Sequence, residues 1–296
     1  MNAPVTVGMP VFNNATTLKR GVESLLAQTY PPNLILISDD ASTDATNVVG
    51  LSLASQHPSV RYVRQTFNLG PTRNFRFVLD MSKTPFFMWL AGDDYLEPDY
   101  IARTAAVLNT QPDVVSCVSH VLFTRTDGSS RIAPGTYPLT HDRATNLALY
   151  LSDPTDNSRL FSLHRTKVIQ AAFPRGDFLI GYDWAAMAAT LMHGKHARVP
   201  EVLMVRDETS PDAYCRMIRR YYRFPPLRML PMARMSWDLL WRVRIPHDRR
   251  VIRALLAVNL MMHIEYMRRH HPRYTTIVSF LERSILWRFR TVDKLD

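Results

Sequence analysis

The stretch at residues 86–98, FFMWLAGDDYLEP, decides the expected fold. The apolar run Phe86–Leu90 predicts a buried strand, which ends near the adjacent carboxylates Asp93 and Asp94. A helix is expected to begin just after Asp99, whose side chain suits the N-cap position. In an open parallel sheet, ligands bind at the carboxyl ends of the strands. The carboxylate oxygens of Asp93 and Asp94 at such a position would suit Mg²⁺ or Mn²⁺. The alternative is a solvated turn in which an aspartate caps the next helix.

Short apolar runs alternate with helical patterns before and through this stretch. Strands are expected at residues 5–9, 34–37, 60–63 and 86–90, and helices at about residues 45–55 and 68–81. A further helix is expected between a cap at Thr16 or Thr17 and a stop at Tyr30. This alternation predicts an α/β fold with a doubly wound, mostly parallel sheet. Asn13, Asp40 and Asp93 each follow a strand, so we expect them on one edge, where a nucleotide would lie. The first strand lacks both Gly-x-Gly-x-x-Gly and the P-loop pattern, which argues against a dinucleotide oxidoreductase or a P-loop NTPase.

The composition fits a globular protein of a reducing compartment. Of the 296 residues 46% are hydrophobic, enough to bury a core as one large domain or as one domain with an appendage. Cys117 and Cys215 are too few for a disulfide framework or a cysteine-based zinc site. The N-terminus shows no basic segment followed by an apolar one, so we expect a cytoplasmic protein without a secretory signal.

The net charge of +10 is concentrated in the last quarter of the chain. Between Arg216 and Arg290 there are seventeen arginines, no lysine and four acids. We therefore expect two parts. Residues 1–213 would form a catalytic domain, and residues 214–296 would form a basic, arginine-rich helical region with a different partner.

Five motifs of the first part occur in a fixed order. They are Pro10-Val11-Phe12-Asn13, Asp39-Asp40-Ala41-Ser42-Thr43-Asp44, Asn68-Leu69-Gly70 with Arg73-Asn74, Gly92-Asp93-Asp94, and Tyr182-Asp183. With these motifs the chain resembles the family 2 inverting glycosyltransferases over residues 4–210. That resemblance implies a GT-A fold and a nucleotide-diphosphate sugar as the donor. Five ordered motifs are far more specific than any single one.

The resemblance implies a nucleotide-binding role for Pro10, Phe12, Asn13, Asp40, Asn68 and Arg73. Pro10, Phe12 and Asp40 would line the pocket for the base, and Asp40 would accept a hydrogen bond from a base N–H. Asn68 and Arg73 would donate hydrogen bonds near the nucleotide or the sugar.

Two of these motifs also have a structural interpretation. Ser42 or Thr43 could cap the helix expected from residue 45, which is compatible with a binding role. Arg73 on its own would be more typical of a surface salt bridge.

The same resemblance places a divalent cation, Mn²⁺ or Mg²⁺, at Asp93 and Asp94, which match the end of the family's Asp-x-Asp motif. The metal would neutralise the leaving diphosphate. Ala91 stands where the family usually has the first aspartate of that motif. This departure affects the expected nucleotide affinity and choice more than the expected binding of the metal by Asp93. Glu208 lies where family members often carry a metal-binding histidine, and it could supply a further oxygen ligand.

Asp183 is the residue that the resemblance assigns as the catalytic base. An inverting transfer needs one base opposite the leaving group to take the proton of the acceptor hydroxyl. An aspartate at the start of a helix is also favoured by the helix dipole, so the residues alone leave both roles open. Tyr182 replaces a glutamate that often precedes this aspartate in the family.

The basic region combines arginine clusters with aromatic and aliphatic residues in helical patterns. Val251–Met267 is its most apolar stretch, but the charged and polar residues within it argue against a spanning helix. Basic amphipathic helices with Trp and Leu suit an anionic membrane surface. One alternative is a helical subdomain packed on the catalytic domain, with solvated or paired arginines. Nucleic-acid binding is a third possibility that no recognised motif supports.

These expectations combine into one functional hypothesis. The chain would be a metal-dependent inverting glycosyltransferase that moves a sugar from a nucleotide-diphosphate donor, with UDP favoured, to a hydroxyl of a glycan or lipid-linked acceptor. It would serve surface polysaccharide synthesis and would be cytoplasmic, peripheral at the inner face of the membrane. The alternative is a non-catalytic protein of the same fold that binds a membrane or an assembly partner. Ala91, Tyr182 and Glu208 keep that alternative open.

Overall fold

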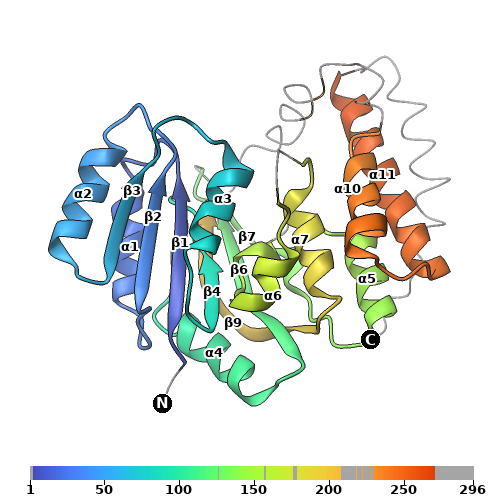
Figure 1. Ribbon diagram of the computed structural model, residues 1–296, viewed down its shortest axis with the longest axis horizontal. Helices are drawn as coiled ribbons and strands as arrows, with labels where there is room; N and C mark the ends of the chain where they lie inside the picture. The colour runs from blue at the N-terminus through green and yellow to red at the C-terminus, as the bar shows by residue number, and fades with distance from the viewer. Residues whose placement is uncertain are drawn as a thin grey trace.

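The structure is a computed structural model of the chain. It describes residues 3–125, 127–156, 158–175, 179–207 and 230–270, together with residues 218, 222 and 228. Within these residues, nine strands form one sheet in the order β3-β2-β1-β4-β8-β6-β9-β5, with β7 paired to β6 (Figure 1).

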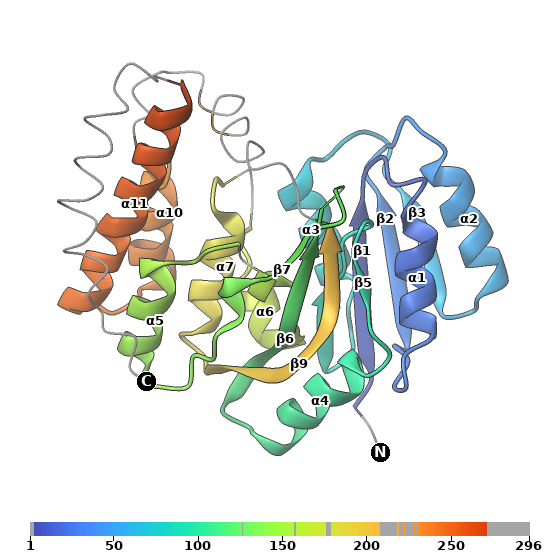
Figure 2. The same cartoon turned by 180° about the vertical axis from the view of Figure 1, so that it is seen from behind.

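The N-terminal half alternates strands and helices as the sequence predicts. Its elements are β1 (Val5–Val11), α1 (Leu18–Leu26), β2 (Leu34–Asp39), α2 (Thr46–Gln56), β3 (Val60–Arg64), α3 (Pro71–Asp80) and β4 (Phe86–Trp89). β2 and β4 both pair in parallel with β1, and β3 pairs in parallel with β2. α3 covers the face of the sheet turned toward the viewer in Figure 1, and α1 covers the opposite face, seen in Figure 2. The predicted doubly wound parallel arrangement is confirmed.

The following segment completes the sheet with antiparallel pairs and one further parallel pair. Its elements are β5 (Tyr95–Leu96), α4 (Tyr100–Thr110), β6 (Val114–Thr124), β7 (Ser130–Ile132), η1 (Pro134–Thr136), α5 (Arg143–Ser152), η2 (Ser158–Phe161), β8 (Leu163–Arg165), α6 (Thr166–Ala172), α7 (Tyr182–Thr190) and β9 (Lys195–Asp207). β8 lies antiparallel between β4 and β6, whereas β9 pairs in parallel with β6 and antiparallel with β5. β9 thereby brings its C-terminal end beside the loop that follows β4.

Continuous apolar runs become the central strands because helices cover both faces of the sheet. Every residue of β1 and of β4 is buried. Gly8, in the middle of β1, permits close packing of α3, since a Cβ atom there would lie 2.6 Å from Cγ2 of Val78. The strands are therefore held firmly, and their C-terminal ends form a fixed edge for a site.

The predicted helix caps are used differently from what we expected. Asp99 is the N-cap residue of α4, but its carboxylate accepts a hydrogen bond from the Thr29 hydroxyl, 2.7 Å away, instead of capping the helix. Neither Ser42 nor Thr43 caps α2, whose N-cap residue is Ala45. The Ser42 hydroxyl instead accepts a hydrogen bond from the backbone N–H of Asn13, at 2.9 Å. These side chains join neighbouring loops, a long-range use that local sequence signals do not reveal.

The described part of the C-terminal region packs against the preceding domain. It contains α10 (Ala233–Asp238), the π-helical turn η3 (Leu239–Val243) and α11 (Arg249–His270). α11 runs along α5, and α10 and η3 lie against α7 (Figure 1). Met235, Leu239 and Val258 belong to the same hydrophobic core as the central strands. The predicted boundary between residues 213 and 214 lies outside the described residues, and residues 230–270 match the alternative of a packed helical subdomain.

Several arginines of this region are paired with its acids. Arg242 pairs with Asp238, Arg250 pairs with Asp248, and Glu265 accepts from Arg268 and Arg269. None of the helices formed by the described residues combines the length and apolar character that crossing a membrane requires.

Candidate functional site

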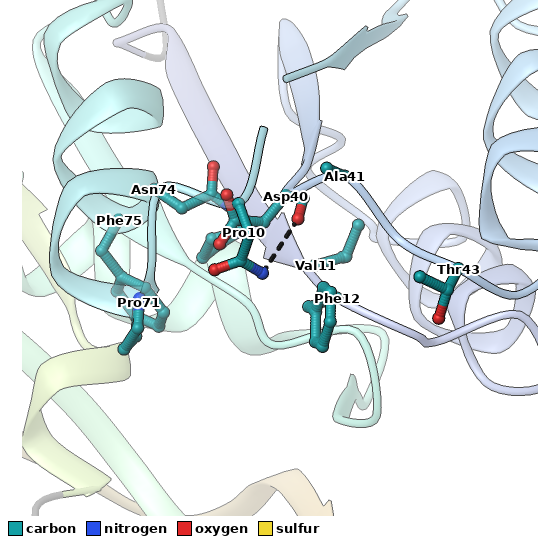
Figure 3. A pocket seen from close by; sticks show the side chains of 10 residues that line it. Pro10, Val11, Phe12, Asp40, Ala41, Thr43, Pro71, Asn74 and Phe75 are labelled. Atoms are coloured by element: carbon teal, nitrogen blue, oxygen red, sulfur yellow. Dashed lines mark hydrogen bonds between the residues drawn. The ribbon is translucent and has the colours of Figure 1, made fainter. Parts of the chain in front are cut away.

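A pocket of about 640 Å³ opens where β1 and β2 end (Figure 3). Its walls come from the ends of these two strands and from the N-terminal turns of α3 with the loop before it: Pro10, Val11, Phe12, Asp40, Ala41, Thr43, Asn68, Pro71, Asn74 and Phe75. A volume of this size is typical of a small-molecule site, and the position is where open α/β sheets bind ligands.

Asp40 holds one wall of the pocket in place. Its Oδ1 accepts a hydrogen bond from the N–H of Leu69 at 2.6 Å, and its Oδ2 accepts one from Gly70 at 3.0 Å. Asn68 Nδ2 donates to the backbone oxygen of Asp40 at 3.1 Å, the contact dashed in Figure 3. Burial raises the pKa of the Asp40 carboxyl, and the two backbone N–H groups oppose that rise. Each carboxylate oxygen still has a lone pair for a ligand donor.

The two strand-end loops are fastened to each other by Asn13. Its backbone lies in the left-handed region, with φ of 57°, and its Oδ1 accepts from the N–H of Thr43 at 2.8 Å. Ala41 has the same unusual φ of 57°. The Asn13 side chain is engaged between loops and does not line the pocket, whereas the ring of Phe12 does and is 48% exposed. An exposed aromatic ring at a pocket mouth is suited to stack on a planar base.

α3 contributes wall residues that the sequence analysis gave no role. Pro71, Asn74 and Phe75 follow an i, i+3, i+4 spacing, so they share one helix face, and that face lines the pocket. Asn74 is buried, donating through Nδ2 to the backbone oxygen of Ser38 at 3.0 Å and accepting from the Ser38 hydroxyl at 2.6 Å. The polar residue Asn74 on this helix face was the signal in the sequence that could have identified these wall residues. Arg73 lies on the exposed side of α3 and is not part of the lining.

Asp93 follows β4 in a loop that lies against the end of β1. A Cβ atom on Gly92 would lie 2.7 Å from Cγ of Asn14, so the two loops are in direct contact. Asn14 in turn accepts from the N–H of Phe12 at 3.1 Å, at the edge of the pocket. Arg20 donates to the backbone oxygen of Asp93 and stacks over the ring of Tyr95 at 4.7 Å. Asp93 is half-buried and does not line the pocket itself, but its loop is held against the segment that carries Phe12.

Asp94 is engaged in a buried ion pair. Its Oδ2 accepts from Nε of Arg206 at 2.8 Å, and its side chain is only 2% exposed. Burial raises the pKa of Asp94 to about 6, although the Arg206 guanidinium acts to lower it. Of the two predicted metal ligands, Asp93 is therefore the one open to solvent.

The third predicted metal ligand, Glu208, lies outside the described residues. Among the residues that the structure describes, no three His, Cys, Asp or Glu side chains gather closely enough to form a metal site on their own.

Asp183 lies in the first turn of α7, which begins after Gly181 in the left-handed conformation. The half-buried carboxylate accepts from the N–H of Trp184 at 2.9 Å. The ring of the preceding Tyr182 packs edge-on against Phe75, with ring centroids 6.1 Å apart, and Phe75 lines the pocket. The start of α7 is thus joined to the pocket wall through aromatic contacts.

Comparison with known proteins assigns the chain to a family. The family model for glycosyl transferase family 2 matches residues 6–170, more than half of the chain. The chain belongs to glycosyl transferase family 2. Four of the five motifs lie inside this match, and Tyr182-Asp183 lies beyond it.

Curated relatives of this family 2 glycosyltransferase match a limited part of it. An uncharacterised glycosyltransferase of Rickettsia typhi is 29% identical over 105 residues, which are 36% of this chain and 32% of that protein. An uncharacterised protein of Mycobacterium tuberculosis is 28% identical over 121 residues, 40% of this chain and 35% of that protein. The chain therefore matches about a third of the length of these relatives.

Solved structures share the fold over most of the chain. S. aureus TarS 1–349 in complex with UDP-GlcNAc superposes with a TM-score of 0.65 at 14% identity, covering 95% of this chain and 77% of TarS 1–349. The mannosyltransferase PcManGT from Pyrobaculum calidifontis, in complex with GDP-Man and Mn²⁺, superposes with a TM-score of 0.58 at 16% identity, covering 97% and 83%. The GT-A fold predicted from the sequence is confirmed.

Proposed function

We propose that this family 2 glycosyltransferase is an inverting, metal-dependent enzyme that uses a nucleotide-diphosphate sugar. The observation that carries the proposal is the pocket at the ends of β1 and β2, with two neighbouring segments packed beside it: Gly92, next to Asp93, contacts Asn14, and Tyr182, next to Asp183, packs on the lining residue Phe75. A binding pocket, a candidate metal ligand and a candidate base are thereby arranged around one edge of the sheet.

The nucleotide would occupy the pocket of about 640 Å³. Phe12 offers a ring face for the base, and Asp40 retains acceptor capacity for a base N–H. Binding of UDP-GlcNAc by TarS and of GDP-Man by PcManGT supports a nucleotide-sugar donor for a chain of the same fold. Of these two nucleotides we favour UDP.

The residues present fit a divalent cation that arrives with the donor. Mg²⁺ and similar ions are commonly bound by one or two carboxylates together with substrate phosphates and water, so a complete protein cage is unnecessary. Asp93 supplies the carboxylate, and the Mn²⁺ in the PcManGT complex supports divalent metal use in this fold. When bound, such an ion would stabilise the negative charge of the leaving diphosphate.

Asp183 would act as the general base. Its carboxylate would take the proton of an acceptor hydroxyl as the acceptor oxygen attacks the anomeric carbon. The new carbon–oxygen bond forms on the face opposite the diphosphate, and the bond to the diphosphate oxygen breaks with its electron pair. The proton stays on Asp183, and the configuration at the anomeric carbon is inverted.

We also propose a glycan or lipid-linked acceptor, a role in surface polysaccharide synthesis, and peripheral association with the cytoplasmic face of a membrane. The arginine-rich composition after Arg216 supports an anionic surface as partner. Flotation of the full chain with vesicles containing anionic lipid, compared with neutral vesicles, tests this association. Equal recovery with both vesicle types would reject it.

The experiment that tests the enzymatic proposal is a thermal-shift screen of UDP, GDP, dTDP and CDP, each with and without Mn²⁺. Binding to the native state raises the melting temperature by mass action. We expect one nucleotide to give a shift that depends on Mn²⁺ in the parent and is lost in Asp93→Asn, while Lys167→Ala, at an exposed position of α6 outside the pocket, keeps it as the control. A shift with none of the four nucleotides would instead favour the non-catalytic alternative.

A further inference from the structure

A second pocket, of about 330 Å³, lies beside α7 on the C-terminal helices. It is lined by the loop before α7, by α10 and by η3: Leu179, Arg234, Trp237, Asp238, Trp241 and Arg242. None of these residues belongs to the pocket at the ends of β1 and β2. The second pocket is therefore distinct from the proposed donor pocket.

Two exposed indole rings dominate this pocket. Trp237 is 66% exposed and Trp241 is 63% exposed, so neither side chain serves the core. Their ring centroids are 5.1 Å apart, and their planes are inclined by 36°. Two large aromatic faces fixed side by side in water provide contact area at little further cost in side-chain entropy, an arrangement common at binding sites.

A paired polar group borders the indoles. Arg242 donates from Nε and Nη2 to the two oxygens of Asp238, at 2.6 and 2.7 Å. The pair presents a planar set of donors and acceptors, and the exposed Arg234 adds a positive charge. Trp241 and Arg242 both belong to the π-helical turn η3, a rare conformation that frequently occurs at functional sites.

One lining residue of the pocket lies just before the helix that bears the proposed base. The backbone oxygen of Leu179, a lining residue, accepts a hydrogen bond from the N–H of Tyr182 at 3.0 Å. Asp183 is the next residue along the chain. α10 and η3 both pack against α7, so the indoles are carried on elements in contact with the helix that bears Asp183.

We propose that the pocket formed by Trp237, Trp241 and the Asp238–Arg242 pair binds a saccharide unit of the acceptor. This inference rests on the proposed function. A sugar ring has an apolar face of C–H groups, which suits an indole, and a rim of hydroxyls, which suits the donors and acceptors of the ion pair.

A saccharide fits this pocket better than a membrane surface does. A lipid surface is contacted by a convex or flat apolar face with cationic groups free for phosphate, whereas here the indoles line a concavity. Asp238 adds a negative charge that an anionic surface would repel, and it already neutralises Arg242.

The test measures binding of the full chain to an array of immobilised oligosaccharides of neutral, amino and acidic sugars. The double variant Trp237→Ala/Trp241→Ala is compared with the parent. We expect the oligosaccharides bound by the parent to bind the double variant roughly tenfold more weakly, since two ring contacts are lost. Trp237→Phe/Trp241→Phe should recover part of the binding. Leu256→Ala is the matched control, because Leu256 is a large apolar residue of α11 that is also exposed, at 56%.

The nucleotide thermal shift is recorded on the same samples and should be unchanged in every variant. If the parent binds no oligosaccharide, or if the double variant binds as well as the parent, the inference is wrong. If the nucleotide thermal shift is still present, only the saccharide site is rejected and the enzymatic proposal stands. If the parent shows no nucleotide shift, the enzymatic proposal itself is rejected. Loss of vesicle flotation in the double variant with array binding unchanged would assign the indoles to a membrane and overturn the saccharide site.

Discussion

Arg206, near the end of β9, forms a buried ion pair with Asp94, which directly follows Asp93 in the loop after β4. Nε of Arg206 lies 2.8 Å from Oδ2 of Asp94, and the guanidinium stacks on the ring of Phe161 at 4.1 Å. The pair couples the last strand of the sheet to the loop that presents Asp93. The ion pair thus holds Asp94 in place, and with it the position of the neighbouring Asp93.

Replacing Arg206 by Met should destabilise the protein more at alkaline than at acidic pH. The pKa of Asp94 is about 6 in the folded chain, above its usual 3.8, and it should rise further without Arg206. A raised carboxyl pKa means that the native state binds more protons than the unfolded state, so stability falls as pH rises through this range. At pH 8 the variant would bury an unpaired carboxylate, and the loss should be about 3–5 kcal/mol. At pH 5 the carboxyl is mostly protonated, and the loss should be clearly smaller.

Urea unfolding of the parent and of Arg206→Met at pH 5 and at pH 8 measures this difference. Arg103→Met is the matched control, because the pair of Arg103 with Glu201 is exposed. Exposed pairs contribute about 0–1 kcal/mol, so this variant should lose little at either pH. A loss for Arg206→Met that is equal at the two pH values would contradict the assignment of Asp94 as a titrating buried partner.

Asp183→Asn should abolish most transfer without weakening nucleotide binding. The amide oxygen can still accept from the N–H of Trp184, as Asp183 Oδ1 does at 2.9 Å, so α7 should keep its first turn. An amide cannot take the acceptor proton, and loss of a general base typically costs about 10²–10⁴ in rate. Transfer is measured with the donor that the thermal-shift screen selects, and the shift itself is the control. A variant with near-parental transfer would remove Asp183 from the base role and leave it as a residue favoured by the helix dipole.

The central strands could be predicted because residues near one another in sequence determine them. β1 and β4 are mostly apolar and buried along their whole length, and β2 carries an apolar run and is buried after its first residue, as expected of strands covered on both faces. The Asp94–Arg206 pair joins residues 112 positions apart, and neither side chain carries a local sign of its partner. Asn74 shows the same limit, since its role depends on Ser38 in another element. Local patterns therefore placed the site on one edge of the sheet, whereas the contacts that shape it required the folded chain.

Gly92→Ala should disturb the site more than the fold. A Cβ atom at this position would lie 2.7 Å from Cγ and 2.9 Å from Cβ of Asn14, so the loop with Asp93 must move away from the end of β1. Overpacking of this kind costs about 1–3 kcal/mol. We expect a modest fall in melting temperature but loss of the Mn²⁺-dependent nucleotide shift. The double variant Gly92→Ala/Asn14→Gly removes the clashing atoms and should restore part of that shift. If Gly92→Ala binds nucleotide and Mn²⁺ like the parent, the contact between these loops does not set the position of Asp93.

His164→Gln should reduce the sensitivity of the fold to mild acid. His164 is completely buried in β8, where its Nε2 donates to the backbone oxygen of Leu160 at 3.0 Å and its Nδ1 accepts from the Ser116 hydroxyl at 2.9 Å. Burial lowers the pKa of His164 to about 4, from its usual 6.5. The unfolded chain therefore takes up a proton below pH 6.5 that the native chain refuses until about pH 4, and stability is lost as pH falls through this window. Glutamine has no such proton to take up, so this contribution disappears in the variant.

At pH 7 we expect His164→Gln to be less stable than the parent by about 1–3 kcal/mol, because buried hydrogen bonds are disturbed. The deficit should shrink by about 2 kcal/mol between pH 7 and pH 5, since each pH unit below 6.5 costs the parent about 1.4 kcal/mol. Urea unfolding at the two pH values measures it, and the exposed His247→Gln serves as the control. The raised pKa of Asp94 makes stability change with pH in the opposite direction. This contribution is the same in the parent and in His164→Gln, so it cancels when their stabilities are compared. A deficit that stays constant or grows toward pH 5 would show that His164 is not held neutral in the folded protein.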